Sequence, residues 1–311
     1  MKRDIRLSIV IPVFNGAGTI GELVDRLIHR LDQFQLEIIL INDHSHDNSE
    51  EVCIGIQKKH PRIVCFYSLA KNVGEHNAVL AGLNNVSGDY VVIMDDDFQN
   101  PPSEVVKLVD AAVENDYDVI YTYYDKKQHS FFRNFGSWFN DKMANIMLHK
   151  PKDLYLSSFK LINRFLVNEI TKYKSPFPYI DGLILQTTDN IGKVKVEHHE
   201  RREGRSNYTL KKLISLWIRS FTNFSILPLR VSVILGLIFS FFGIAYGIFV
   251  IIERILHPGM APGMASLIVS VAIFAGVQLI AIGMIGEYVG RIFLAQNKKP
   301  QYTIKRAFPK K

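Results

Sequence analysis

The sequence predicts an α/β fold, with a mostly parallel sheet covered by helices on both faces, followed by interfacial helices and two transmembrane helices. Two observations predict this class. From Arg6 to about Tyr124, short β-branched runs alternate with amphipathic helical segments, and the apolar run Val91–Met94 is typical of a strand buried on both faces. Farther along the chain, charged residues disappear from two long stretches. The sheet and the membrane attachment are therefore predicted in separate parts of the chain.

Strands and helices are predicted to alternate before Tyr124. The expected strands are Leu7–Phe14, Glu37–Asp43, Ile63–Ser68, Tyr90–Asp95 and Asp118–Tyr124, and the later helices are Ser49–Lys59, Glu75–Asn85 and Ser103–Glu114. The first helix is expected to run through Leu31, because Thr19 with Glu22 three residues later is a capping-box pattern. Such a sheet binds ligands at the carboxyl ends of its strands, so polar residues there are candidate site residues.

The pattern is less regular after Tyr124. The expected elements are a helix over Phe131–Leu148, one or two strands over Asp153–Asn163, a proline-broken loop over Ser175–Asp181, a helix to about Thr188 and a strand over Lys193–His199. Apolar residues at helical spacing, interleaved with basic residues, predict a helix in the membrane interface over Leu210–Phe224. Pro228 is expected to break the chain before the first span.

Val231–Ile252 and Met264–Gly286 contain no Asp, Glu, Lys or Arg. At about 1.5 Å per residue, each is long enough to cross a hydrocarbon core of about 30 Å. A pair of buried core helices is the alternative, and the absence of a polar face disfavours it. The predicted organisation is a globular domain over 1–208, an interfacial helix and linker over 209–230, a transmembrane hairpin over 231–290 and a basic tail over 291–311.

Basic residues flank the outer ends of both spans, whereas the loop Glu253–Gly263 carries Arg254 as its single cation. By the positive-inside rule, both ends of the hairpin face the cytoplasm. Met1–Arg6 leads straight into a strand without a signal-peptide pattern, so the first domain is expected in the cytoplasm. The net charge of +7 fits contact with anionic lipid, and the absence of a recognition motif argues against nucleic acid as a partner.

Asp95, Asp97 and Gln99 follow the expected strand Tyr90–Asp95 directly. In an extended chain, residues two apart point the same way, so these side chains could present three oxygen ligands together, with Asp96 pointing elsewhere. Hard oxygens suit Mg²⁺ or Mn²⁺, and Mg²⁺ commonly takes one or two carboxylates while substrate phosphates supply further ligands. A solvated acidic turn is the plainer alternative, which the position at a strand's carboxyl end disfavours.

Further candidates lie at the carboxyl ends of the first two expected strands. Asp43 is placed to accept hydrogen bonds from a base or ribose, because Ser45 and Asp47 already offer caps for the next helix. Pro12, Phe14 and Asn15 end the first strand in the same crevice, where an ordinary Pro-Asn turn is the alternative.

Three motifs together resemble the inverting family 2 glycosyltransferases of GT-A fold: Val10-Ile-Pro-Val-Phe-Asn15, Asn42-Asp43-x-Ser45-x-Asp47 and Asp95-x-Asp97-x-Gln99-Asn100-Pro-Pro. More narrowly, the chain is similar to the polyprenyl-phosphate glycosyltransferases, which include dolichol-phosphate mannose synthase, the bactoprenol glucosyltransferases and the undecaprenyl-phosphate formamido-arabinose transferase. The resemblance extends from about Leu7 to Tyr302 and includes both spans. It implies transfer of a sugar, from a UDP-sugar in the preferred hypothesis, to a polyprenyl phosphate such as undecaprenyl phosphate at the bacterial inner membrane.

The resemblance also implies roles for residues. Asp95, Asp97 and Gln99 would hold the metal on the donor diphosphate, with Asp96 contacting the nucleotide-sugar, and Asp43 would contact the base. Arg133 and Ser137 would bind the acceptor phosphate; they lie four apart on the expected helix and so on one face. Arg201 and Ser206 match a segment that folds over the donor diphosphate, although the surrounding arginines could also form a lipid-headgroup patch.

Asp181 is expected either to contact the sugar or assist the acceptor, or to cap the following helix. A phosphate nucleophile with a second pKa of about 6 needs no strong base, so positioning and neutralisation of the leaving diphosphate would carry catalysis. Relatives form tetramers, and a homo-oligomer is expected. The alternatives are a processive polysaccharide synthase, which usually needs more membrane helices, and a non-catalytic membrane scaffold.

Overall fold

The computed structural model describes residues 4–124, 151, 154–197, 227–257, 263–297 and 299–310. The chain divides into two compact units, one formed by Met1–Thr209 with Lys298–Lys311 and the other by Leu210–Asn297. The expected helices Phe131–Leu148 and Leu210–Phe224 lie outside the described residues.

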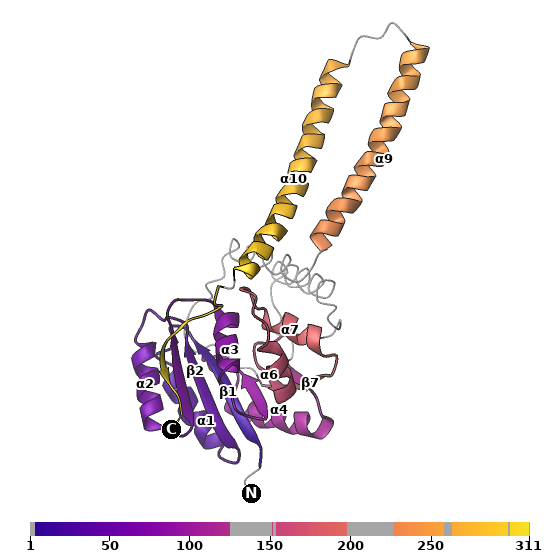
Figure 1. The fold of residues 1–311 in the computed structure, drawn as a ribbon. Helices are drawn as coiled ribbons and strands as arrows, with labels where there is room; N and C mark the ends of the chain where they lie inside the picture. The colour runs from indigo at the N-terminus through magenta and orange to yellow at the C-terminus, as the bar shows by residue number, and fades with distance from the viewer. Residues whose placement is uncertain are drawn as a thin grey trace. The chain divides into compact units, whose positions relative to one another are not determined.

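The first unit is built on one mixed sheet of eight strands (Figure 1). Its strands are β1 (Arg6–Val13), β2 (Gln35–Asn42), β3 (Val64–Leu69), β4 (Tyr90–Ile93), β5 (Val119–Tyr123), β6 (Lys160–Asn163), β7 (Ile191–Lys195) and β8 (Ile304–Phe308). They are ordered β7-β5-β6-β4-β1-β2-β3-β8. The central strands β4, β1, β2 and β3 pair in parallel, as the sequence predicts, while β6 and β8 run antiparallel to their neighbours. The carboxyl ends of β4, β1 and β2 therefore meet at one edge of the sheet.

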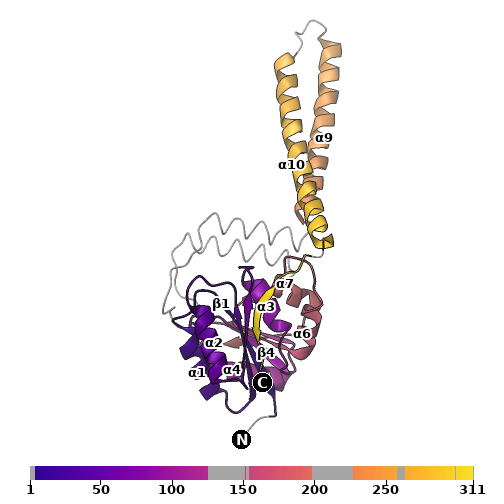
Figure 2. The same ribbon diagram turned by 60° about the vertical axis from the view of Figure 1, so that its left-hand side comes forward.

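Helices cover both faces of this sheet (Figure 2). Side chains of α1 (Ile20–Arg30), α2 (Ser49–Lys59) and α4 (Pro102–Asn115) pack in one hydrophobic cluster, and those of α3 (Glu75–Leu83), α6 (Arg164–Ile170) and α7 (Ile180–Thr187) pack in a second. The central strands are buried on both faces because alternate residues of β1 belong to the two clusters. Each cluster is a continuous apolar core that fixes the strand ends in place.

The first helix begins after Thr19 as predicted, but not through a capping box. Thr19 makes no side-chain cap and instead donates its hydroxyl to the carbonyl of Gly16, 3.2 Å away. Glu22 forms an ion pair with Arg26 one turn later. Both side chains of the expected motif are therefore engaged elsewhere, and the helix start is set by the β1–α1 turn.

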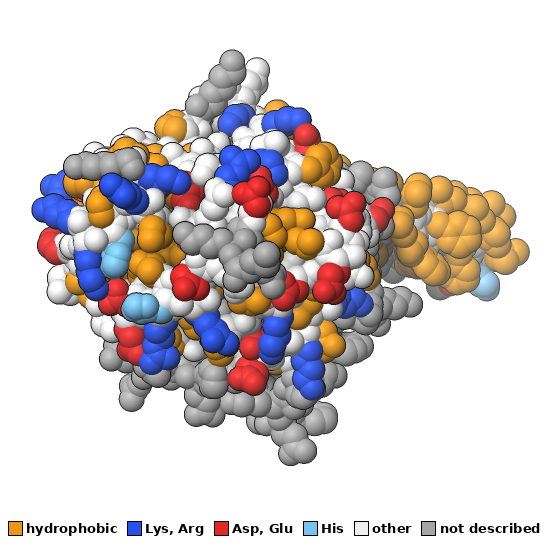
Figure 3. All heavy atoms as spheres, turned by 90° about the horizontal axis from the view of Figure 1, so that it is seen from below, with side chains coloured by type: hydrophobic (Ala, Val, Ile, Leu, Met, Phe, Trp, Pro, Cys, Tyr) orange, Lys and Arg blue, Asp and Glu red, His pale blue; other side chains and the backbone are white. Residues whose placement is uncertain are grey.

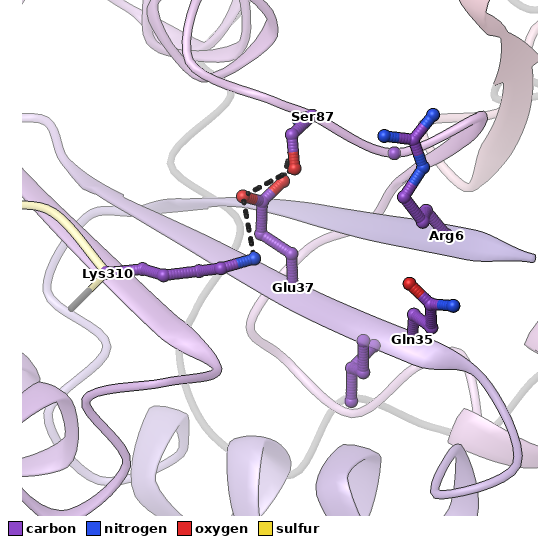
Figure 4. Close-up of a pocket in the computed structure, with 7 residues that line it drawn as sticks. Arg6, Gln35, Glu37, Ser87 and Lys310 are labelled. Atoms are coloured by element: carbon purple, nitrogen blue, oxygen red, sulfur yellow. Dashed lines mark hydrogen bonds and ion pairs between the residues drawn. The ribbon is translucent and has the colours of Figure 1, made fainter.

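The strand β8 is the main element that the sequence analysis did not predict, because it lies in residues expected to form a basic tail. It pairs antiparallel with β3, and Phe308 stacks on Phe66 with ring centroids 5.9 Å apart. Arg306 pairs with Glu50 of α2 at 2.9 Å. Beyond the strand, Lys310 lies 3.9 Å from the carboxylate of Glu37, which also accepts a hydrogen bond from Ser87 (Figure 4). The chain after the hairpin is thus part of the first unit's sheet.

The second unit contains α9 (Leu227–Leu256) and α10 (Met264–Gln296). Two segments, Ser232–Glu253 and Ile273–Gln296, are long and apolar enough to cross a membrane, and neither is buried within the protein. Their large apolar side chains form an almost continuous hydrophobic surface, whereas charged side chains are interspersed over the first unit (Figure 3). Pro228 lies in the first turn of α9, where a missing N–H costs no helical hydrogen bond. The residues just before Leu227 lie outside the described part of the chain, so the break expected at Pro228 stays a prediction.

Candidate functional site

The turns after β1 and β2 are tied together by reciprocal hydrogen bonds. Ser45 Oγ accepts from the Asn15 N–H at 3.0 Å, and Asn15 Oδ1 accepts from the His46 N–H at 2.9 Å. Asn15 and His44 both adopt left-handed backbone conformations, with φ of 57° and 56°. Asn tolerates this region better than most residues, because its short side chain can bond locally. The two turns therefore form one rigid rim at the end of the sheet.

Of the candidates at the end of β1, Pro12 lies within the strand and Phe14 and Asn15 lie on this rim. Phe14 is 45% exposed and meets His46 edge to face, with ring centroids 6.0 Å apart. An exposed aromatic ring held by a neighbouring imidazole offers a flat apolar surface to a ligand.

Asp43 follows β2 directly, and its carboxylate is hydrogen-bonded within the fold. Its two carboxylate oxygens accept hydrogen bonds from the Val73 and Gly74 N–H groups, at 2.7 and 2.9 Å, and the side chain is buried. Burial raises the pKa of this carboxyl group, and the two N–H donors lower it. Asp43 therefore holds the turn that leads into α3, and its contact with a base stays a prediction.

The acidic motif leaves the sheet earlier than predicted, because β4 ends at Ile93. Phe98 adopts a left-handed conformation with φ of 62° and buries its ring, with the Arg26 guanidinium over that ring at 5.2 Å. The chain is therefore not extended through Asp97 and Gln99, and strand alternation does not place their side chains. Instead, the Gln99 N–H donates to Asp97 Oδ1 at 3.1 Å, so a tight turn connects the two residues.

The Asp95 carboxylate is buried close to other negatively charged groups. Ser158 donates its hydroxyl to Asp95 Oδ2 at 2.7 Å. Burial, together with the negative charges of Glu75 and Asp97, raises the pKa of Asp95 to about 6. A cation bound beside Asp95 and Asp97 would relieve this repulsion, and the donor set of two carboxylates and the Gln99 amide suits a hard divalent ion.

The carboxylate of Asp96 lies against the β1–α1 turn, at Gly16. A Cβ atom added to Gly16 would meet Asp96 Oδ2 at 1.9 Å. A side chain at position 16 would displace the Asp96 carboxylate, so the acidic turn and the rim of the first two strands come into contact here. This contact brings the candidate nucleotide-binding residues of β1 and the acidic motif of β4 to one place.

A cavity of about 220 Å³ adjoins the acidic turn. It is lined by the start of α3, the end of β4, the start of β6 and the start of α7: Glu75, His76, Val79, Ile93, Leu156, Ser158, Lys160, Tyr179, Ile180 and Asp181. Ser158 connects it to the acidic motif through the bond to Asp95. The lining combines apolar walls with a few charged groups, which is the usual composition of a small-molecule site.

Asp181 lies in this cavity and does not cap α7, whose N-cap residue is Tyr179. Its Oδ1 accepts a hydrogen bond from the Tyr121 hydroxyl at 2.8 Å and forms an ion pair with Lys160. The side chains of Lys160 and Asp181 are 5% and 9% exposed, so the pair is almost fully removed from water. Among its two expected roles, the geometry favours contact with a ligand in the cavity over helix capping.

The structure therefore joins Asp95, Asp97 and Gln99 in one turn and links that turn through Ser158 to the cavity lined by Asp181. Phe14 and Asn15 lie on the rim, Asp96 meets that rim at Gly16, and Pro12 lies within β1. Arg133, Ser137, Arg201 and Ser206 lie outside the described residues. Within the described part of the chain, no group of three or more His, Cys, Asp or Glu side chains is arranged to hold a metal ion. Any metal here would have to draw on the Gln99 amide and on ligands from the substrate.

Sequence reasoning did not single out Glu75, His76, Tyr121, Ser158 or Lys160 as site residues. Glu75 and His76 open a helix after the turn held by Asp43, and no motif marks Tyr121 in β5, Lys160 in β6 or Ser158 just before β6. Their common signal is position: Tyr121 bonds Asp181, and the other four line the cavity with it. That signal becomes visible only when β6 is known to lie beside β4.

Comparison with known proteins agrees with this architecture. A family model described as Glycosyl transferase family 2 matches residues 8–171. The undecaprenyl-phosphate 4-deoxy-4-formamido-L-arabinose transferase of Edwardsiella ictaluri is 33% identical over 309 residues, which cover 96% of this chain and 93% of that protein. The protein of the same name from Aeromonas hydrophila subsp. hydrophila is 32% identical over 310 residues, with 97% and 94% coverage.

Among solved structures, glucosyl-3-phosphoglycerate synthase from Mycobacterium tuberculosis in complex with Mn²⁺ and UDP-glucose matches with a TM-score of 0.52. The match covers 70% of this chain and 77% of that chain at 18% sequence identity, so it bears on the fold alone. The α/β fold, the acidic motif at the end of β4 and the whole-length relatives agree with one another. The chain belongs to glycosyl transferase family 2, as its motifs predict, and it is a glycosyltransferase of GT-A-like fold.

Proposed function

We propose that the protein transfers a sugar from a nucleotide-sugar, a UDP-sugar, to a polyprenyl phosphate, with undecaprenyl phosphate as the physiological acceptor. The observation that carries this proposal is the match over 96% of the chain to a relative named as an undecaprenyl-phosphate sugar transferase. The relative is matched over 93% of its own length, so the similarity includes the hairpin as well as the sheet. The product would be a lipid-linked sugar for modification of the cell envelope.

Asp95, Asp97 and Gln99 are the residues that would hold a divalent cation, Mg²⁺ or Mn²⁺. The raised pKa of Asp95 supports this assignment, because a carboxylate crowded by Glu75 and Asp97 gains most from a nearby positive charge. When bound, the cation would neutralise charge on the donor diphosphate. In the solved structure of the mycobacterial synthase, Mn²⁺ is present together with UDP-glucose.

The protein's own groups would then position the reactants. Asp43, Pro12, Phe14, Asn15, Asp96 and Ser206 are assigned to the nucleotide-sugar, and Arg133 and Ser137 to the acceptor phosphate. That phosphate is largely deprotonated near neutral pH, since its second pKa is about 6, and it can attack the anomeric carbon without a strong base. Arg201 would stabilise the departing diphosphate, and attack from the opposite side inverts the configuration.

Membrane attachment through the hairpin fits a lipid acceptor. The segments before and after the hairpin belong to the same compact unit, since Lys298–Lys311 joins Met1–Thr209. Two crossings return the chain to the side from which it started, so this connection supports a multi-pass protein with the sheet domain on one side. We assign that side to the cytoplasm of the bacterial inner membrane, where nucleotide-sugars are made, and we keep a homo-oligomer as part of the proposal.

The test is a donor screen with the full-length protein in detergent or nanodiscs. UDP- and GDP-sugars are each incubated with undecaprenyl phosphate and Mg²⁺ or Mn²⁺, and the lipid fraction is analysed by mass spectrometry. We expect one UDP-sugar to yield a lipid-phosphate sugar, and EDTA to abolish the product. Transfer at a normal rate in EDTA would remove the metal from the proposal, and absence of any lipid-linked product would overturn the proposed acceptor.

A further inference from the structure

Glu75 stands apart from the other charged groups that line the cavity. It is the first residue of α3, and its side chain lines the cavity. Asp181 is paired with Lys160, and Asp95 accepts the hydroxyl of Ser158. Within the part of the chain that the structure describes, Glu75 makes no hydrogen bond and no ion pair. Its carboxylate is therefore available to a ligand.

The charge of Glu75 is also not cancelled locally. The Lys160 ammonium lies within the ion pair with Asp181, so these two side chains contribute little net charge. The pKa of Glu75 is raised by burial and by Asp181, while Lys160 lowers it. A ligand group that donates a hydrogen bond to Glu75 would be favoured, and a second carboxylate at that position would be repelled.

The rest of the lining suits a single sugar ring. The rings of His76 and Tyr179 meet edge to face with centroids 5.0 Å apart, and Val79, Ile93 and Leu156 supply apolar wall. The cavity, at about 220 Å³, is smaller than the 300–1,000 Å³ that is typical of drug-sized ligand sites. Ser158 ties it to Asp95, next to which the proposed donor diphosphate would lie. The sugar attached to that diphosphate is the group that could enter.

We propose that Glu75 is a specificity-determining residue of the donor site, which accepts a hydrogen bond from a hydroxyl or ammonium group of the transferred sugar and discriminates against sugars that carry a carboxylate. This inference rests on the proposed function, because it requires the sugar of a nucleotide-sugar to occupy the cavity. Lys160 and Asp181 act with it as positioning residues, since their buried ion pair lines the same cavity.

The experiment measures binding to the full-length protein in nanodiscs with Mn²⁺, for three probes: UDP, UDP-glucose and UDP-glucuronate. In the wild type, UDP-glucuronate is expected to bind more weakly than UDP-glucose. Glu75→Gln should lower the ratio of the UDP-glucuronate to the UDP-glucose dissociation constant by about tenfold or more, which corresponds to about 1.4 kcal/mol. Affinity for UDP, which has no sugar in the cavity, should stay within about twofold.

Two further variants keep the result interpretable. Glu75→Asp retains the charge and should retain discrimination, and Glu51→Gln, an exposed glutamate in the first turn of α2, should change neither ratio nor affinity. An unchanged ratio in Glu75→Gln, or the same change in Glu51→Gln, would overturn the role of Glu75 alone. A wild-type protein that binds UDP but gains nothing from the attached glucose, and transfers no sugar to lipid in the donor screen, would overturn the proposed function as well.

Discussion

Asp97 connects the acidic turn to Gln99 and lies next to the group with the raised pKa, Asp95. Asp97→Ala should remove a proposed ligand of the cation and lower the rate of transfer by at least about 100-fold, the order of loss that follows removal of a group that stabilises transition-state charge. The initial rate with undecaprenyl phosphate measures this, alongside the thermal unfolding midpoint.

Asp32→Ala is the matched control, because Asp32 is an exposed carboxylate in the turn after α1. It should leave both rate and midpoint unchanged. A rate above about a tenth of wild type in a folded Asp97→Ala protein would contradict the role of Asp97, since a tenfold loss corresponds to only about 1.4 kcal/mol.

The buried His76 should make the stability of the sheet domain depend on pH. Burial lowers its pKa from the ordinary 6.5, with Asp181 opposing and Lys160 reinforcing the shift. Below pH 6.5 the unfolded chain therefore takes up a proton that the folded protein resists, so this residue's contribution to the free energy of unfolding is lost as the pH falls from 6.5.

The unfolding midpoint of His76→Gln should therefore decline less than that of the wild type between about pH 7 and pH 5.5, the range in which an ordinary histidine titrates. His29→Gln, at an exposed imidazole in the last turn of α1, should decline as the wild type does. Equal declines in wild type and His76→Gln would show that His76 does not resist protonation.

The candidate site illustrates which residues a sequence can identify. Asp95, Asp96 and Asp97 were predictable because they follow an apolar strand directly and carry chemistry in their own side chains. The engagement of Asp43 was not, because its partners, Val73 and Gly74, are 30 and 31 residues away. Glu75 and Lys160 were missed for the same reason: their importance depends on a cavity built by α3, β6 and α7 together.

Among the elements, β8 carries a testable consequence. Phe308 stacks on the fully buried Phe66 of β3. Without β8, β3 would be an edge strand with unpaired backbone groups. Phe308 is itself half-buried, so Phe308→Ala should cost about 1–2 kcal/mol, below the 3–5 kcal/mol of a fully buried phenylalanine.

The measurement is the thermal unfolding midpoint of the purified protein, with Lys305→Ala as control because Lys305 is exposed on the same strand. For a domain of this size the Phe308→Ala midpoint should be lower by about 2–6 °C, and the Lys305→Ala midpoint should be unchanged. Identical midpoints for the two variants would mean that β8 adds no stability to the sheet.

The contrast between β8 and the central strands shows what sequence patterns can and cannot predict about elements. The cores of β1 to β5 were predicted because they are buried on both faces and read as continuous apolar runs. The run Ile304-Lys-Arg-Ala-Phe308 is an edge strand with only one covered side, so its composition resembles a basic tail. The helix α6 was likewise not predicted, since seven residues are too few to show a helical period.

At the scale of the whole molecule, the hairpin is inserted into the sheet domain's chain rather than attached after it. The first unit contains both Met1–Thr209 and Lys298–Lys311. Gln301 reinforces this connection by donating hydrogen bonds to the carbonyls of Tyr173 and Ser175, at 3.1 and 2.8 Å, in the loop that leads to α7. A truncation that ends before the hairpin therefore removes β8 and these bonds together with the membrane anchor.

The role of the hairpin is tested by replacing residues 210–297 with a flexible Gly/Ser linker while keeping 298–311. This protein should fold and bind UDP as the wild type does, because every strand of the sheet is retained. It should transfer sugar to long-chain undecaprenyl phosphate in vesicles much more slowly.

A chain cut after residue 209 should show the same loss of transfer and, in addition, a lower unfolding midpoint, because β3 loses its partner β8. Comparing the two separates anchoring from stability. If the linker protein works on vesicles at the wild-type rate, the hairpin is not what brings the domain to its acceptor; if the cut protein is as stable as the linker protein, β8 is dispensable to the sheet.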